Sequence, residues 1–101
     1  MIFLKGGVSY AKKNGVKVGE NCRIYTTSFG SEPFLIKIGN KVTITSGVKF
    51  ITHDGTTWLM EDKKGRRYYY QHIEIGDNVF VGVNSIIMPG VKIENNVIVA
   101  A

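Results

Sequence analysis

Aliphatic residues recur at every sixth position in the C-terminal third of the chain. The series is Ile75, Val81, Ile87, Ile93 and Val99. Four residues after each of the first four stands a slim or β-branched residue, namely Val79, Ser85, Val91 and Val97. Neither a helical period of 3.6 nor simple strand alternation gives a spacing of six. The pattern therefore predicts a solenoid of three-faced coils that share one narrow core, with the aliphatic side chains pointing inward.

The same register begins earlier in the chain and is broken twice. Earlier units start at Val18, Ile24, Ile38, Ile44 and Phe50, and a degenerate one at Tyr69. The register slips by two residues near 30–33. The period is lost over 54–68, which predicts a loop extruded from the solenoid, a common place for function. Residues 1–15 form an N-terminal lead-in. Gly directly after the aliphatic residue, as at Gly39 and Gly76, is expected to supply the positive φ of a tight corner. Residues that tolerate the left-handed region would also be useful at Asn21, Asn40, Asn78 and Asn84.

Two segments resemble a known family. The hexads with IGDNVFVGVNSIIMPGVKIENNVIVAA look like those of hexapeptide-repeat acyltransferases, and GSEPFLIKIGNKVTITSGVKFITHDG resembles the branch of maltose, galactoside and polysaccharide O-acetyltransferases. The resemblance covers residues 15–101. It implies an all-β fold, a left-handed parallel β-helix forming one domain over 1–101. It also implies a homotrimer that binds acetyl-CoA between neighbouring subunits. A β-sandwich is the alternative for a chain rich in Val, Ile and Gly.

His53 is the candidate general base. It stands in Thr-His-Asp at the edge of the periodic region, and histidine titrates near neutral pH, where it can take a proton from a hydroxyl. In the resembling family the histidine of this motif has that role. Asp54 either orients the imidazole or caps the loop. The resemblance implies direct transfer of an acetyl group to a hydroxyl of a sugar or polysaccharide precursor, without an acyl-enzyme.

The resemblance also suggests binding positions. The pantetheine arm of the cofactor matches Phe80, Val83 and Ala101, with Asn84 and Ser85 as neighbours. Acceptor-site candidates by family position are Ser31 and Glu32. Trp58 either stacks on a sugar ring or fixes the loop to a neighbouring subunit. His72 is interpreted as structural, and Cys22 as a small filler of the core rather than a nucleophile.

Composition limits location and partners. The 101 residues are 44% hydrophobic, which suits one compact domain, and no apolar run reaches the ~20 residues of a membrane span. With one cysteine and no export signal, a cytoplasmic protein is expected. The net charge of +5 owes most to Lys63, Lys64, Arg66 and Arg67. Cations confined to one loop are not the spread footprint of a nucleic-acid-binding protein, so no nucleic acid partner is expected. The loop is interpreted first as solvated, then as attracting an anionic partner, and last as binding nucleic acid.

Other functions remain open. A γ-type carbonic anhydrase resembles the fold but needs three zinc-bound histidines, and the chain has 2, so no metal is expected. An N-acetyltransferase for an amino sugar or nucleotide-linked amino sugar shares the scaffold. A catalytically inactive structural solenoid is the non-enzymatic alternative. The last hexad opens at Val99 and stops at Ala101, so the chain is expected to be truncated, a fragment that lacks a further coil.

Overall fold

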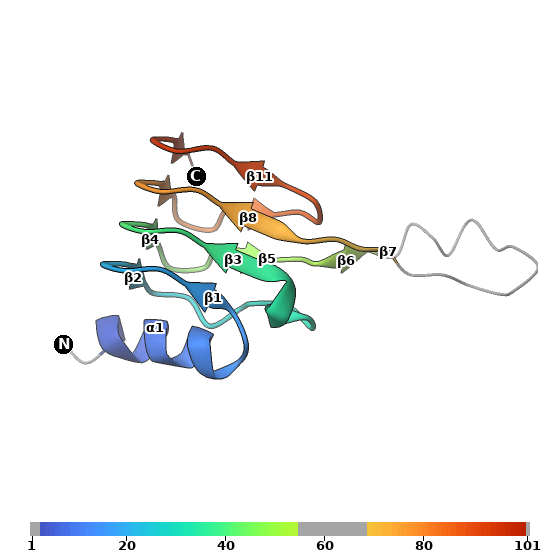
Figure 1. Cartoon of the computed structure of the whole chain (residues 1–101), viewed down its shortest axis with the longest axis horizontal. Helices are drawn as coiled ribbons and strands as arrows, with labels where there is room; N and C mark the ends of the chain where they lie inside the picture. The colour runs from blue at the N-terminus through green and yellow to red at the C-terminus, as the bar shows by residue number, and fades with distance from the viewer. Residues whose placement is uncertain (1–2, 55–68, 101) are drawn as a thin grey trace, which may run out of the picture.

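The computed structural model describes residues 3–54 and 69–100, with backbone alone for 3–6, 53–54 and 69–70. It is a stack of short strands wound around a narrow interior, above one helix (Figure 1). The first half of the stack contains β1 (Lys17–Val18), β2 (Arg23–Ile24), β3 (Ile36–Ile38), β4 (Thr43–Ile44) and β5 (Lys49–Phe50). The second half contains β8 (Ile73–Ile75), β9 (Phe80–Val81), β10 (Ile86–Ile87), β11 (Lys92–Ile93) and β12 (Ile98–Val99).

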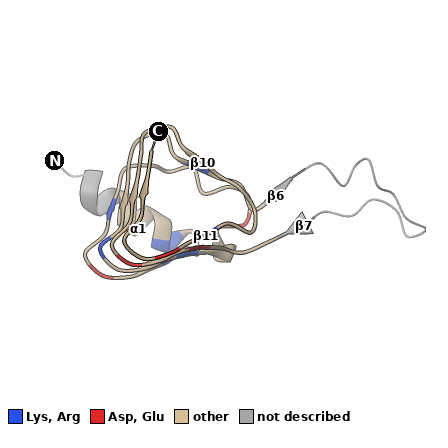
Figure 2. Cartoon of the chain, turned by 90° about the horizontal axis from the view of Figure 1, so that it is seen from above, with Lys and Arg blue, Asp and Glu red and all other residues tan. Residues whose placement is uncertain are grey.

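The strands form three stacked parallel sheets. Sheet A has the order β1-β3-β8-β11, sheet B the order β12-β9-β4-β2, and sheet C pairs β10 with β5. Each strand pairs in parallel with the equivalent strand of the next coil, for example Ile38 with Ile75 and Ile44 with Val81. Seen from above, the three sheets are the sides of a triangle (Figure 2). This is the arrangement of a parallel β-helix and agrees with the six-residue period.

Three corners join the sheets, and we name them by the sheets that they connect. Corner AB contains residues 19–22, 39–42, 76–79 and 94–97. Corner BC contains residues 45–48 and 82–85. Corner CA contains residues 51–52, 71–72 and 88–91.

The predicted inward register is confirmed. Ile75, Val81, Ile87 and Ile93 are at most 8% exposed, and so are the earlier hexad residues Ile24, Ile38, Ile44 and Phe50. Val79, at a slim position, is also buried. Lys92, between two inward residues, is exposed. The two-residue strands therefore each direct one side chain inward, and β3 and β8 direct two each, into a core that continues from coil to coil.

The all-β expectation is wrong for the lead-in. Within residues 1–15 the chain forms helix α1 (Phe3–Lys13), which packs under β1 and β2. Ala11 is fully buried in the core cluster, and Gly7 lies directly against the carbonyl of Ile24. The helix thus covers the apolar end of the first coil, a requirement that strand periodicity does not reveal. No helix among residues 3–54 and 69–100 has the length and apolar character needed to cross a bilayer.

The extruded loop has a stem. Asp54, expected in the loop, lies in β6 (His53–Asp54), which pairs antiparallel with β7 (Tyr69–Tyr70). Tyr69, expected to start a degenerate hexad, therefore belongs to this ladder and not to a solenoid sheet. Residues 55–68 lie outside the described residues. The stem leaves the triangle at corner CA (Figure 2).

The corner glycines act differently from the expectation. Positive φ angles in the hexads belong to five non-glycine residues, Asn21, Lys41, Asn78, Asn84 and Asn96, and to two glycines at other positions, Gly47 and Gly90. Gly39 is not among the glycines with positive φ. A Cβ atom there would lie 2.7 Å from the carbonyl oxygen of Gly76 in the next coil. Gly39 is thus needed for close approach of two coils, and Asn supplies the left-handed turn.

Candidate functional site

The backbone that leads into His53 is held from two sides. Thr52 is fully buried, and its Oγ1 donates a hydrogen bond of 2.5 Å to Oε1 of Glu32. Its carbonyl accepts the backbone N–H of Gln71, at 3.0 Å, from the returning strand of the loop. A buried hydroxyl with a carboxylate acceptor is a strong hydrogen bond, so β6 starts from a fixed point.

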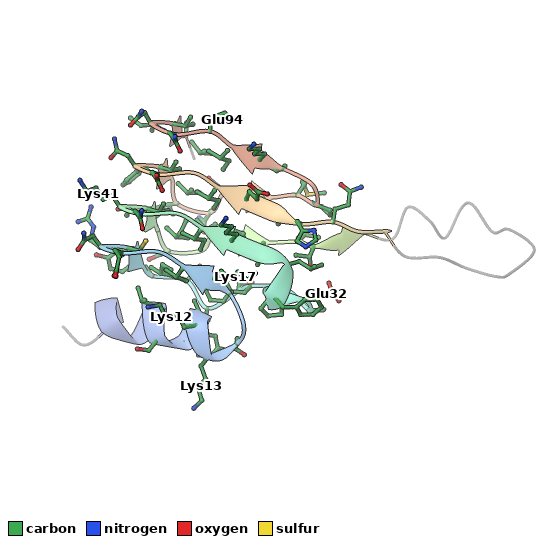
Figure 3. All side chains as sticks on the ribbon, viewed as in Figure 1. Lys12, Lys13, Lys17, Glu32, Lys41 and Glu94 are labelled. Carbon is green, nitrogen blue, oxygen red and sulfur yellow. The ribbon has the colours of Figure 1, made fainter. Side chains whose placement is uncertain are left out.

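The register slip brings Glu32 to this point. Gly30 turns the chain with φ 74°, and Phe29 stacks on Phe50 with ring centroids 5.7 Å apart. The short 3-10 helix η1 (Pro33–Leu35) then returns the chain to β3. The slip and the loop, which the sequence shows as two separate breaks, therefore meet at corner CA. Figure 3 shows Glu32 on the side from which the loop leaves.

The two acceptor-site candidates, Ser31 and Glu32, differ in their exposure and in their contacts. Glu32 is half-buried and bonded to Thr52, whereas Ser31 is exposed. Of His53 and Asp54 the structure describes the backbone, which places both at the foot of the loop, opposite Tyr70 and Tyr69. Trp58, Ala101 and the basic residues 63–67 lie outside the described residues. Their roles stay predictions, as do those of the His53 and Asp54 side chains.

The proposed cofactor positions gather on another part of the coil. Phe80 lies on sheet B and Val83 at corner BC, and their side chains are 43% and 48% exposed. Asn84 has φ 62° and its side chain covers Gly47 in the coil below. Ser85 is half-buried and donates from Oγ to the carbonyl of Gly82 at 2.8 Å. Phe80 and Val83 offer apolar surface to a ligand, while Asn84 and Ser85 stabilise the corner.

These two groups do not meet within one chain. The stem of His53 leaves at corner CA, and Val83 stands at corner BC, with sheet C between them (Figure 2). The resemblance places the base and the cofactor in one groove. The resemblance therefore implies a groove shared between two chains, with the base from one chain and corner BC from the other.

His72 and Cys22 are the two other candidate residues whose surroundings the structure describes. His72 is exposed and lines a hollow of about 90 Å³ with Phe34 and Leu35 at the rim of corner CA. Cys22 is half-buried against the core, and its Sγ lies 3.1 Å from the carbonyl oxygen of Gly39. Within residues 3–54 and 69–100 there is no cluster of three His, Cys, Asp or Glu that could hold a metal ion.

Sequence reasoning missed Thr52. The motif Thr-His-Asp by itself gives Thr52 no role, although its position contains a usable signal. Phe50 points inward, and alternation along an extended chain places the residue two further on the same side. Thr52 is thus a polar residue at an inward position, which requires a hydrogen-bond partner. Glu32 is that partner.

Comparisons with known proteins agree with the repeat. Residues 72–101 match the family described as the hexapeptide repeat of succinyl-transferase. The chain is 56% identical over 83 residues to Protein CapG of Staphylococcus aureus, an alignment that covers 79% of this chain and 48% of that protein. The chain thus spans about half the length of this relative. No solved structure matches the chain.

Proposed function

We propose that this chain is the part of an acetyl-CoA-dependent O-acetyltransferase that contains its general base, His53. The acceptor is a hydroxyl of a sugar or polysaccharide precursor. The match of residues 72–101 to a transferase repeat supports acyl transfer. The observation that carries the proposal is the hydrogen bond from Thr52 to Glu32. This bond fixes Thr52, the residue before His53, and places Glu32, an acceptor-site candidate, in contact with Thr52.

The reaction is a direct transfer in which His53 moves one proton. The imidazole removes the proton of the acceptor hydroxyl as the oxygen attacks the thioester carbonyl. Backbone N–H groups stabilise the negative oxygen of the tetrahedral intermediate. When the carbon–sulfur bond breaks, the imidazolium returns the proton to the departing thiolate. A nucleophilic Ser or Cys is not required, which agrees with the half-buried position of Cys22.

The surface of corner BC fits the cofactor. A pantetheine arm is long, narrow and partly apolar, and Phe80 and Val83 present exposed apolar side chains beside each other on one coil. Asn84 and Ser85 then act by shaping the corner against which the arm lies.

We also propose that the coils wind left-handed and that the β-helix assembles as a homotrimer. The outward side chains of sheet A are all charged, namely Lys17, Lys37, Glu74 and Lys92. By contrast, Val83, Ile86 and Ile98 on sheets B and C and their corner are 48%, 56% and 80% exposed. Apolar side chains that gather in this way favour burial against another copy, which also completes the groove beside His53.

The variant His53→Ala tests the function. Acetyl transfer should fall by about 100-fold or more, the usual effect of losing a general base, while coenzyme A binding stays nearly unchanged. Thiol release and mass gain on a panel of mono- and disaccharides, amino sugars included, measure the transfer and separate hydroxyl from amine acceptors. His72→Ala is the control and should retain activity. Wild-type activity in His53→Ala would remove this residue from the mechanism, and no release with any acceptor would favour an inactive solenoid.

A further inference from the structure

A second hollow lies on sheet B beside corner AB, away from the loop. Its volume is about 510 Å³, within the range of small-molecule sites. Arg23 stands at its lower end, with Lys41 one coil above. Phe80 follows in the next coil, Ile98 stands at the upper end, and Asn21, Asn78 and Asn96 lie along the side. Lys41 lies at the edge of the molecule opposite the loop (Figure 3). Nothing in the proposed reaction uses this lower end.

The lower end of the hollow is positively charged and partly preorganised. No Asp or Glu is among the described residues that line it. Arg23 donates from Nε and Nη2 to Oγ1 of the buried Thr43, at 3.3 and 3.1 Å, which orients the guanidinium. Its Nη1 has no hydrogen-bond partner within residues 3–54 and 69–100. A guanidinium and an ammonium group from neighbouring coils are the groups that hold a phosphate.

Lys41 stands in a backbone conformation that does not suit it. Its φ is 57°, and the equivalent positions of the other coils, with φ of 58° to 61°, are Asn21, Asn78 and Asn96. Asn tolerates the left-handed region well, whereas Lys does so at an energetic cost. Only at Lys41, in the coil next to that of Arg23, does one of these four equivalent positions have this energetic cost of a left-handed backbone. A strained residue of this kind points to a use for its side chain.

We propose that this hollow binds a small organic phosphate, with the phosphate between Arg23 and Lys41 and the rest of the molecule reaching Phe80. The exposed ring of Phe80 offers a surface for an apolar or planar group. Phe80 is thus shared between this hollow and the proposed cofactor surface. The binding itself needs no turnover, so it stands or falls independently of the proposed function.

A titration of the ¹⁵N-labelled chain with inorganic phosphate at low salt tests the proposal. The Arg23 Nε–H and the Asn78 side-chain amide signals should shift in a saturable way. Lys41→Asn should weaken binding by about tenfold, as expected for a lost charge-assisted hydrogen bond. The same variant should melt about 2–6 °C higher, because Asn relieves the backbone. A loss of affinity together with a gain in stability distinguishes a ligand site from a structural role.

Lys92→Gln is the matched control, since it removes one positive charge from the exposed face of sheet A. It should change phosphate affinity by less than about twofold, because the charge is remote and screened. An equal loss of phosphate affinity in Lys92→Gln and Lys41→Asn would mean that net charge alone explains the binding, and it would contradict the proposed site. Unchanged binding in Lys41→Asn, or no saturable shift in the wild type, would overturn it as well.

Competition identifies the source of the phosphate. Displacement of inorganic phosphate by glucose 1-phosphate, and not by coenzyme A, assigns the hollow to a phosphorylated acceptor. Displacement by coenzyme A assigns it to the phosphates of the cofactor. Failure of both to displace inorganic phosphate contradicts the proposal of an organic phosphate.

Discussion

The carboxylate of Asp77 accepts the backbone N–H of Asn40, one coil away, at 2.8 Å. The same bond recurs along corner AB. Asn40 accepts the N–H of Glu20 at 2.8 Å, and Asn95 accepts the N–H of Asp77 at 2.7 Å. A column of side-chain oxygens thus satisfies the backbone donors of one corner from coil to coil, in place of water.

Asp77→Ala should lower the free energy of unfolding by about 1 kcal/mol, the value of one lost hydrogen bond at a partly solvated site. Asp77→Asn should cost much less, because an amide oxygen fills the same place at residues 40 and 95. Urea denaturation of both variants measures the difference. An equal loss in the two would mean that charge, and not the acceptor oxygen, stabilises the corner.

Ile87→Ala should destabilise the fold by about 2–5 kcal/mol, since the stacked coils cannot close the cavity that it leaves. Ile87 is 4% exposed. Lys92→Ala, at an exposed position of the neighbouring hexad, should change stability by about 0.5 kcal/mol or less. Thermal melts compare the two, and similar losses would contradict the inward register.

Gly7→Ala should destabilise the chain, although alanine favours a helix over glycine by about 1 kcal/mol. The added Cβ would collide with the carbonyl oxygen of Ile24, a backbone atom that cannot rotate away. Ser9→Ala is the control, because Ser9 lies in the same helix but is exposed. It should raise the melting temperature slightly. A gain in both variants would show that α1 does not pack closely on the first coil.

Thr52→Val should reduce acetyl transfer by about tenfold through displacement of His53, with the fold retained. The replacement keeps the shape and removes the bond to Glu32. Thr26→Val is its matched control: Thr26 is also buried and donates to the carbonyl of Val48 at 2.7 Å, in another part of the coil. Both should lose similar stability in urea, and only Thr52→Val should lose activity. Equal activities of Thr52→Val and Thr26→Val would show that the hydrogen bond between Thr52 and Glu32 does not contribute to the reaction.

Val83→Lys should convert a trimer to monomers, because it places a charge on the apolar surface of corner BC. Sedimentation gives the mass directly. Lys92→Glu, on the charged face of sheet A, should leave the assembly intact. A Val83→Lys variant that still sediments as a trimer would move the subunit contact elsewhere.

The inward register could be predicted from the sequence, because a period of six repeats the same inward and outward positions in every unit. Ile87 and Lys92 illustrate this. Helix α1 could not. Gly6 and Gly7 weaken its intrinsic propensity, and packing on Ile24 offsets that weakness.

The inward position of Thr52 shows that it needs a hydrogen-bond partner, but which residue is that partner could not be predicted from the sequence. Glu32 and Thr52 are 20 positions apart, and their contact depends on how the slip bends the chain at Gly30. Sequence periodicity says that the slip exists but not the direction in which it turns. The position of His53 at the foot of the loop follows from the broken period, whereas the contact of Glu32 with Thr52 follows from tertiary packing alone.

The extruded loop also divides the folding of the molecule. Glu20 and Asn40 are 20 positions apart in the chain and Asp77 and Asn95 are 18 apart, whereas Asn40 and Asp77, on opposite sides of the loop, are 37 apart. Closing a segment twice as long costs about 0.6 kcal/mol more chain entropy. Contacts within each half of the stack are therefore more local than those between the halves. We expect the pairing of β3 with β8, across the loop, to form last. The segment that holds the proposed chemistry thus lengthens the chain closure that joins the two halves of the stack.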